Sequence, residues 1–164
     1  MDHVIKEIKG CMDNNFYFAA LALALTIPNV CASFEKMGKA SGGDYADWCN
    51  RYVKPELDID GWILYSLRCS FLHNISGDFY SEKAFNKYLN QGKESGEQRA
   101  QVFEFFFPHQ DAERLVIYRH ETEETVERMP CVSLMITSII HGYENFVLAN
   151  PGFSHEYDYL YFEG

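Results

Sequence analysis

Arg68 and His73 are the two residues of this 164-residue sequence whose types and spacing suggest chemistry. Four residues separate them, near the end of a stretch with helical periodicity. An arginine holds a phosphate or a developing negative charge with a planar fork of donors. A histidine titrates near neutrality, so it can act as a general base or a general acid. The pair therefore predicts a site that holds an anion and moves a proton.

The same two residues also have a purely structural interpretation. Arg68 would extend its charge to solvent along its aliphatic stem, or pair with a carboxylate. His73 would stand at the C-terminus of its helix, where the helix dipole favours a positive charge. The sequence leaves the chemical and the structural interpretation open.

The helix that must position this pair is predicted over residues 59–73. Asp58 or Asp60 would cap its N-terminus by accepting the free backbone N–H groups of the first turn. A helix that is apolar on two sides is expected at the centre of a fold, so we expect this one to be the most buried. Its two apolar stripes consist of Trp62, Tyr65, Cys69 and Leu72, and of Leu64, Leu67 and Phe71.

Three further long helices are predicted from apolar residues that recur at the helical period. Each begins at a residue with a short polar side chain, which is typical of an N-cap. They span about residues 14–27, 44–54 and 132–149, with Asp13, Asp44 and Ser133 as the caps.

The N-terminal region is predicted to contain a short helix over residues 2–11, with Val4, Ile5 and Ile8 facing inward. Pro28 either kinks the helix that follows or begins a new one at its first turn. Gly38 is expected to end that helix.

The sequence changes character before the last helix. Val102–Phe107 and Leu115–His120 are β-branched and aromatic runs, which predict a small β-hairpin near residues 101–120, and residues 125–128 could add a third strand. A tail of aromatic and acidic residues follows at 152–164. We therefore expect a mainly α-helical fold, an up-and-down bundle with a hairpin insertion, in one domain over residues 1–164.

The net charge of −10 disfavours a broad nucleic-acid surface, because backbone binding needs clustered lysines and arginines. We expect no DNA partner, although a small pocket for one phosphate stays compatible with this charge. The apolar run Phe16–Ile27 is too short to span a bilayer and lacks a positive flank, so we interpret it as a core helix and expect no membrane association.

The cysteines predict free thiols in a reducing compartment, and hence a cytoplasmic protein. Their number is odd and no pair has C-x-x-C spacing, which argues against a disulfide framework or a zinc ribbon. They are Cys11, Cys31, Cys49, Cys69 and Cys131.

Other chemical candidates are weaker. Cys69 and His73 are four residues apart and could share a metal, but the sequence places no further ligands beside them. Ser41–Gly43 lacks the lysine of a phosphate-binding loop. Arg114 and His120 have a similar spacing to the first pair, but they lie in a predicted strand. We expect no metal and no cofactor.

Two segments carry a resemblance to the HEPN-like helical domains. They are Asn15–Glu35, NFYFAALALALTIPNVCASFE, and Tyr65–Ser76, YSLRCSFLHNIS. The family motif, an arginine and a histidine separated by four to six residues, maps onto Arg68 and His73. With the segment YADWCNRYV and the last helix, the resemblance covers about residues 14–75 and 132–149.

The resemblance implies a homodimer in which two Arg/His pairs share one cleft and cleave RNA without a metal. One histidine would take the 2′-hydroxyl proton and the other would protonate the leaving oxygen. Active members usually carry a polar residue directly after the arginine, where this chain has Cys69. A thiol is a weak donor. The alternative is therefore a non-catalytic scaffold or interaction module, and either function could involve an unknown protein partner or an antitoxin.

Overall fold

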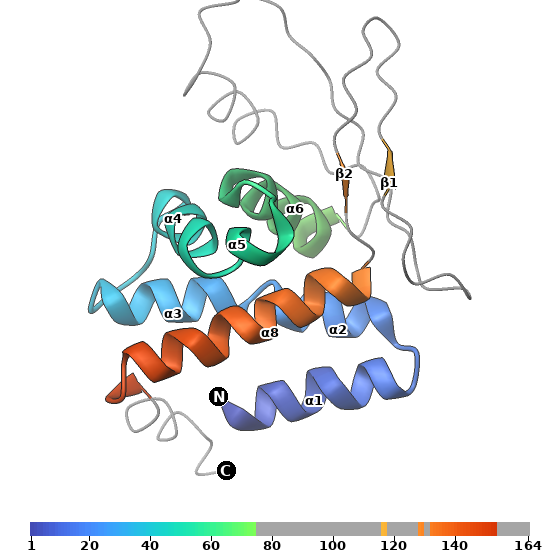
Figure 1. Cartoon of the computed structure of the whole chain (residues 1–164), viewed down its shortest axis with the longest axis horizontal. Helices are drawn as coiled ribbons and strands as arrows, with labels where there is room; N and C mark the ends of the chain where they lie inside the picture. The colour runs from blue at the N-terminus through green and yellow to red at the C-terminus, as the bar shows by residue number, and fades with distance from the viewer. Residues whose placement is uncertain (75–115, 118–127, 130–131, 154–164) are drawn as a thin grey trace, which may run out of the picture.

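The computed structural model describes residues 1–74, 116–117, 128–129 and 132–153, and these residues are mostly helical (Figure 1). The mainly α-helical character expected from the sequence is confirmed. The elements are α1 Asp2–Asp13, α2 Tyr17–Ala24, α3 Ile27–Glu35, α4 Gly42–Tyr52, α5 Lys54–Leu57, α6 Gly61–Asn74, β1 Val116–Ile117, β2 Arg128–Met129 and α8 Val132–Ala149.

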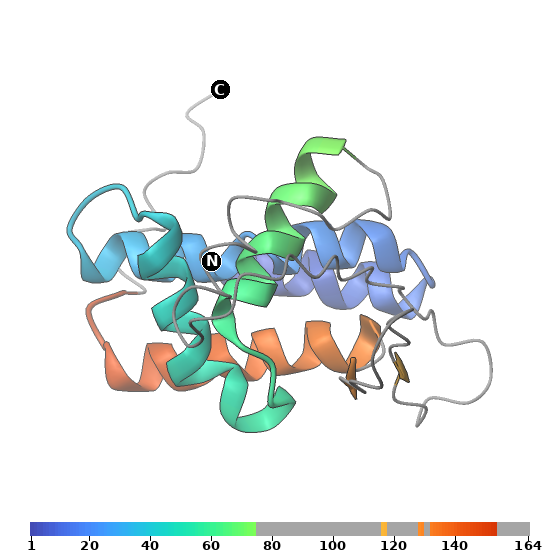
Figure 2. The same ribbon diagram turned by 90° about the horizontal axis from the view of Figure 1, so that it is seen from above.

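The helices stack in tiers. Figure 1 shows α4, α5 and α6 on one side of α2, α3 and α8, with α1 on the opposite side. Figure 2 shows α6 crossing obliquely over the helices beneath it. One apolar cluster joins the tiers, with residues from every helix of the described chain.

Of the three residues predicted to face inward on the first helix, Ile5 and Ile8 are buried and Val4 is partly buried against the core. It is longer than expected and includes Asp13, so this aspartate does not cap the next helix as predicted. Asn15 adopts a left-handed backbone conformation, with φ 60°, and the Phe16 N–H donates to the Cys11 carbonyl at 2.7 Å. This is the hydrogen-bond pattern of a Schellman ending, and it delays the start of α2 to Tyr17.

The predicted helix over residues 14–27 is interrupted by a turn at its C-terminal end. The chain turns at Leu25 and Thr26, and the Thr26 hydroxyl donates to the Leu23 carbonyl at 2.7 Å. Pro28 stands in the first turn of α3, so the second of its two predicted roles is correct.

The end of α3 differs in detail from the prediction. Met37, with φ 51°, takes the left-handed position, and the Gly38 N–H donates to the Ser33 carbonyl at 3.0 Å. The glycine therefore follows the residue that ends the helix instead of occupying that position. This conformation is unfavourable for Met37, because its side chain crowds the left-handed backbone in a way that a glycine would not.

Ser41 caps α4, where the sequence suggested Asp44. The Ser41 hydroxyl accepts the Asp44 N–H at 3.3 Å, and the Asp44 carboxylate accepts the Ser41 N–H at 2.9 Å. This reciprocal pair is a capping box, so Asp44 serves the same helix start from its third position. Tyr45, Trp48 and Cys49 form the inward face of α4 and have no exposed area.

The start of α6 is satisfied by two neighbours. The Asp60 carboxylate accepts the Trp62 N–H at 2.8 Å, so Asp60 rather than Asp58 is the capping residue. The Asn50 side chain on α4 accepts the Gly61 N–H at 2.7 Å. A Cβ atom at Gly61 would lie 2.0 Å from the Ala46 carbonyl oxygen, so α4 and α6 can approach this closely only because residue 61 is glycine.

The last helix packs against more of the described elements than α6 does. α8 contacts α2, α3, α4 and α5, whereas α6 packs mainly on α4 and touches α2. The expectation that α6 would be the central helix is therefore wrong for the described elements. Ser133 is the second residue of α8 rather than its cap. The helix ends near Asn150 as predicted, and its side-chain amide donates to the Phe146 carbonyl at 2.9 Å.

The two short strands bear only partly on the predicted hairpin. Val116 pairs with Met129 and Ile117 with Arg128 in antiparallel register. β1 falls within the predicted strand 115–120, and β2 overlaps the candidate third strand. Residues 102–107 and 154–164 lie outside the described residues, so the hairpin near 101–120 and most of the tail stay predictions.

Two stretches are long and apolar enough to cross a membrane by length and composition alone, Tyr17–Glu35 and Val132–Ala149. About half of each window is buried inside the fold, at 44% and 50%. The turn at Leu25 and Thr26 also divides the first stretch. The finding is therefore weak evidence for a membrane span.

Candidate functional site

Arg68 lies in the second half of α6 with a half-buried side chain. The carbon of its guanidinium group is 5.8 Å from the centre of the Tyr45 ring on α4. This distance is within the range of a cation–π contact, in which the negative face of the ring attracts the cation. The sequence-predicted cation therefore rests on an aromatic side chain of the neighbouring helix.

Tyr45 is fixed in place beneath this cation. Its side chain is completely buried, and its hydroxyl donates to the Leu25 carbonyl at 3.1 Å. The Tyr65 ring on α6 lies 5.5 Å from its ring. Burial raises the pKa of Tyr45 well above its ordinary value, with a smaller upward contribution from Cys49 and an opposing one from Arg68. Tyr45 is therefore a neutral phenol at physiological pH.

The guanidinium of Arg68 lacks a carboxylate partner among the described residues. Its Nε atom is buried and has no hydrogen-bond partner there, while its two terminal nitrogens are not among the buried unpartnered atoms. A buried donor without an acceptor costs about 1–3 kcal/mol. Most other cations of the described chain are paired, in Lys9–Glu144, Lys36–Asp44, Arg51–Glu35 and Lys54–Asp60.

The second predicted site residue, His73, belongs to the last turn of α6, but its side chain lies outside the described part of the chain. The helix continues through His73 to Asn74. Five residues along a regular helix correspond to a rise of about 7.5 Å and a rotation of about 140°. Positions 68 and 73 therefore lie on different faces of the helix.

Cys69, the residue after Arg68, is half-buried beside Tyr65. The pKa of Tyr65 is raised, first by burial and then by the neighbouring Cys69 thiol. The Tyr65 ring packs directly on the start of α4, since a Cβ atom at Gly42 would lie 2.6 Å from its Cζ atom. Cys69 therefore borders the aromatic layer between α4 and α6.

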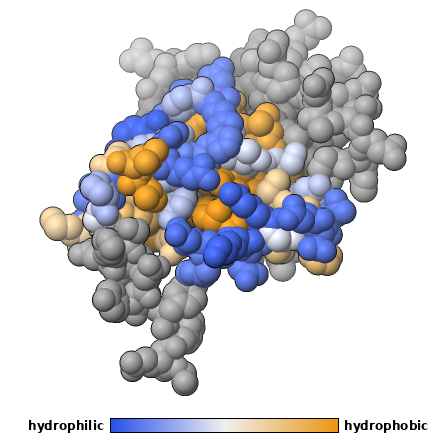
Figure 3. All heavy atoms as spheres, turned by 60° about the horizontal axis from the view of Figure 1, so that its bottom comes forward, coloured by the Kyte–Doolittle hydropathy of each residue, from blue (hydrophilic) through white to orange (hydrophobic). Residues whose placement is uncertain are grey.

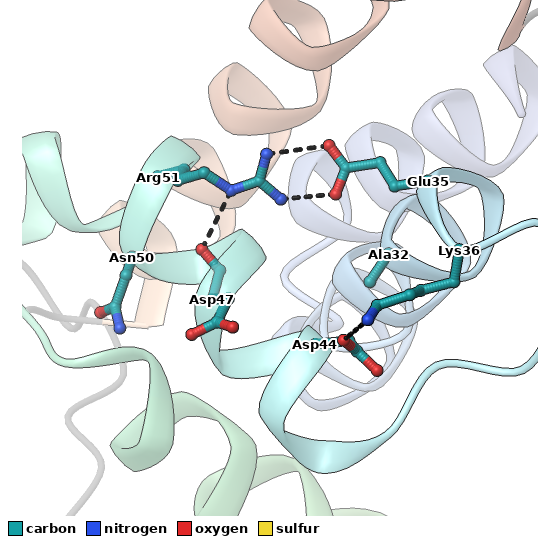
Figure 4. A pocket seen from close by; sticks show the side chains of 7 residues that line it. All are labelled: Ala32, Glu35, Lys36, Asp44, Asp47, Asn50 and Arg51. Carbon is teal, nitrogen blue, oxygen red and sulfur yellow. Dashed lines mark hydrogen bonds and ion pairs between the residues drawn. The ribbon is translucent and has the colours of Figure 1, made fainter. Parts of the chain in front are cut away.

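A charged hollow between α3 and α4 was not anticipated from the sequence. It has a volume of about 470 Å³ and is open to solvent (Figure 4). Arg51 donates to both carboxylate oxygens of Glu35, through Nη1 to Oε1 at 2.9 Å and through Nη2 to Oε2. The Nζ atom of Lys36 lies 2.8 Å from Oδ1 of Asp44. The lining residues are Ala32, Glu35, Lys36, Asp44, Asp47, Asn50 and Arg51.

The cations of this hollow are already neutralised. Asp44 raises the pKa of Lys36, and in turn Lys36, followed by Ser41, holds the pKa of Asp44 below its usual range. Glu35 likewise raises the pKa of Arg51. The hollow thus joins two helices through ion pairs, and a phosphate there would have to displace a carboxylate. Glu35 and Arg51 are 16 residues apart, so no local pattern announces their pairing.

The described thiols are free, as the sequence predicted. Cys31 and Cys49 are buried, and burial raises the pKa of each thiol. Cys11 and Cys69 are half-buried, and Cys131 lies outside the described residues. No three potential metal ligands gather among the described residues.

The surface seen in Figure 3 is largely hydrophilic, with apolar patches interrupted by polar side chains.

No protein-family model, curated protein or solved structure matches this chain. The assignment of a function therefore depends on the residues and contacts described above.

Proposed function

We propose that this chain is a HEPN-like domain that cleaves RNA without a metal, using Arg68 and His73 in a cleft between two copies of the chain. The observation that carries the proposal is the state of Arg68. It is a half-buried cation on the ring of Tyr45, and no described carboxylate neutralises it. A cation held in this way is available to a phosphate, unlike the paired Arg51.

His73 would supply the proton transfers. Cleavage by the neighbouring 2′-hydroxyl needs a base for that hydroxyl and an acid for the leaving oxygen, and imidazole serves either purpose near neutral pH. Because positions 68 and 73 lie on different faces of α6, an arginine and a histidine would meet more readily when a second chain brings its own pair alongside. This is the reason for proposing a homodimer rather than a monomer.

The charge of the chain limits the kind of contact. With a net charge of −10, binding through a broad basic surface is disfavoured, and the affinity would depend on a few local phosphate contacts. We also propose that the protein is cytoplasmic, and its free thiols support this location.

A second function, a non-catalytic scaffold or interaction module, is favoured by Cys69. Its thiol stands where active members of the resembled family usually have a polar side chain, and it borders the buried aromatic layer. In that case the fold would recruit a protein partner, such as an antitoxin. The two functions differ in whether cleavage depends on Arg68 and His73.

The test is incubation of the purified protein with a mixed RNA pool in the presence of EDTA. We expect Arg68→Ala and His73→Ala to lose cleavage by at least about a hundredfold, the lower end for one catalytic acid or base. The matched controls are Arg51→Ala and His141→Ala, which remove an arginine paired with Glu35 and a histidine 3.2 Å from Glu56. Both controls should cleave like the wild type.

The outcome separates the two functions. An inactive wild type, or equal cleavage by all five proteins, would reject the ribonuclease and leave the scaffold. Circular dichroism of each variant shows whether it is folded, so that a loss of activity is not confused with unfolding.

A further inference from the structure

We propose that Tyr45 is a positioning residue for Arg68, and that its ring presents only the terminal Nη atoms of the guanidinium to an incoming phosphate. This inference deepens the proposed function and rests on the assignment of Arg68 to phosphate binding. It names the residue that prepares the cation and the side from which the ligand must approach.

The ring of Tyr45 is immobilised from three directions. The backbone of α4 carries it, and its hydroxyl is held by the Leu25 carbonyl at the turn between α2 and α3. Tyr65 packs beside it at 5.5 Å. Because the side chain has no exposed area, it has no free volume in which to swing away. Tyr45 is therefore a rigid support.

The cation on this support has one hidden side. The Nε atom of Arg68 is buried without a partner, whereas neither of its Nη atoms is among the buried atoms without a partner. An arginine binds a phosphate with two parallel hydrogen bonds, either side-on through Nε and one Nη or end-on through both Nη atoms. Burial of Nε removes the side-on mode. The two non-bridging oxygens of a phosphodiester would therefore meet the two Nη atoms.

Positioning has a kinetic consequence. An arginine that rests on a fixed ring loses less freedom when it binds the transition state than one that rotates in solvent. Removing the ring should therefore reduce kcat, and the phenol hydroxyl should matter little as long as the ring stays in place. Tyr45→Phe and Tyr45→Leu separate these two contributions.

The first measurement is the Nε–Hε resonance of Arg68 in the ¹⁵N-labelled full-length protein, assigned by its loss in Arg68→Lys. A ring beneath the guanidinium shifts this resonance away from the position of free arginine, and burial slows its exchange with water. We expect the shift in the wild type and in Tyr45→Phe, and its loss in Tyr45→Leu. Tyr143→Leu is the matched control, a buried tyrosine on α8 whose hydroxyl donates to Asp2 at 3.3 Å.

The second measurement is RNA cleavage by the wild type, Tyr45→Phe, Tyr45→Leu and Tyr143→Leu. Tyr45→Leu should lower kcat by at least about tenfold, and the effect on KM should be smaller. Tyr45→Phe and Tyr143→Leu should stay within about twofold of the wild type, since both leave the support of Arg68 in place.

The results separate this inference from the function on which it rests. A wild type that cleaves no RNA overturns the proposed function, and the Arg68 resonance still decides whether Tyr45 holds the cation. An unshifted resonance in the wild type, or a shift that survives in Tyr45→Leu, overturns the inference. So does a folded Tyr45→Leu protein that has lost the shift but retains wild-type kcat. If Tyr45→Leu does not fold, the wild-type and Tyr45→Phe resonances decide.

Discussion

Arg51 and Arg68 stand on two helices that pack against each other, but their guanidinium groups have different neighbours. Arg51 binds both oxygens of Glu35 and lies over its own neighbour Tyr52, at 5.1 Å from the ring centre. Arg68 lies over Tyr45 and has no described carboxylate partner. At this scale the difference between a structural and a candidate functional arginine is the presence of one acidic side chain.

Asp44 should make the stability of the fold depend on pH. Lys36 and Ser41 hold the pKa of its carboxyl below the ordinary value of about 4. A lowered pKa in the folded state stabilises the fold above the unfolded-state pKa, and this contribution is lost as the pH falls through the folded-state pKa. Asp44→Asn should therefore lower the free energy of unfolding at pH 7 and weaken its decline below about pH 4.

Urea denaturation at a series of pH values from 7 downward measures this effect. The control is Asp47→Asn, a change one turn along the same helix at an aspartate without an ion pair among the described residues. The control should keep the wild-type pH dependence. An identical pH dependence in Asp44→Asn and the wild type would contradict the assigned role of Asp44.

The thiols should differ in reactivity according to their burial. The thiolate is the reactive form of cysteine, and burial raises the pKa of both Cys31 and Cys49. Cys11 and Cys69 are half-buried and should react first with an alkylating reagent. Mass spectrometry of peptides from the native protein identifies the order, with the urea-unfolded protein as the control in which all react. Labelling of Cys31 or Cys49 as fast as Cys69 in the native protein would refute this prediction.

At the scale of the helices, closely packed pairs depend on individual glycines. A Cβ atom at Gly61 would meet backbone atoms of Ala46, which cannot rotate away as a flexible side chain would. Gly61→Ala should therefore force α6 away from α4 and also disturb the hydrogen bond from the Gly61 N–H to Asn50. We expect a loss of at least about 2 kcal/mol in the free energy of unfolding, within the usual range for overpacking.

Gly10 on α1 provides the matched control for this substitution, because a Cβ atom there would have no neighbour within 4 Å. Alanine is the better helix former, so Gly10→Ala should raise the free energy of unfolding by about 0.5–1 kcal/mol. Chemical denaturation of both variants compares the two effects. Equal changes in the two proteins would mean that the α4–α6 approach does not depend on Gly61.

At the scale of the whole molecule, positions 68 and 73 lie on different faces of α6, which predicts that a productive pair comes from two chains. Arg68→Ala and His73→Ala should each be inactive alone, but a mixture that exchanges subunits should recover part of the cleavage, because a mixed dimer again has one arginine and one histidine in the shared cleft. The recovery should stay below about a quarter of the wild-type rate, because half of the dimers are mixed and each of them lacks the second histidine of the cleft.

The control for the mixture is Arg68→Ala combined with a chain that carries both substitutions, which contains no intact pair. Light scattering should show a dimer at micromolar concentration. A monomer, or an active wild type whose variants never complement each other, would contradict the shared cleft.

The sequence by itself determined the helical class and which helix faces point inward. Helical periodicity is a local property, and it correctly placed Ile5 and Ile8 of α1 inside the core. Pro28 was also correctly linked to a helix start, because its missing N–H and fixed φ act within one turn.

Only the tertiary structure decided which neighbours these residues have. Helix ends and starts were set by local geometry that periodicity does not define. Asn15 and Met37 have left-handed backbone at two helix ends, and Ser41 rather than Asp44 begins the capping box of α4. The position of Arg68 over Tyr45, 23 residues earlier in the chain, depends on the packing of α6 on α4. Contacts between residues so far apart follow from the packing of whole helices, which a local sequence pattern does not contain.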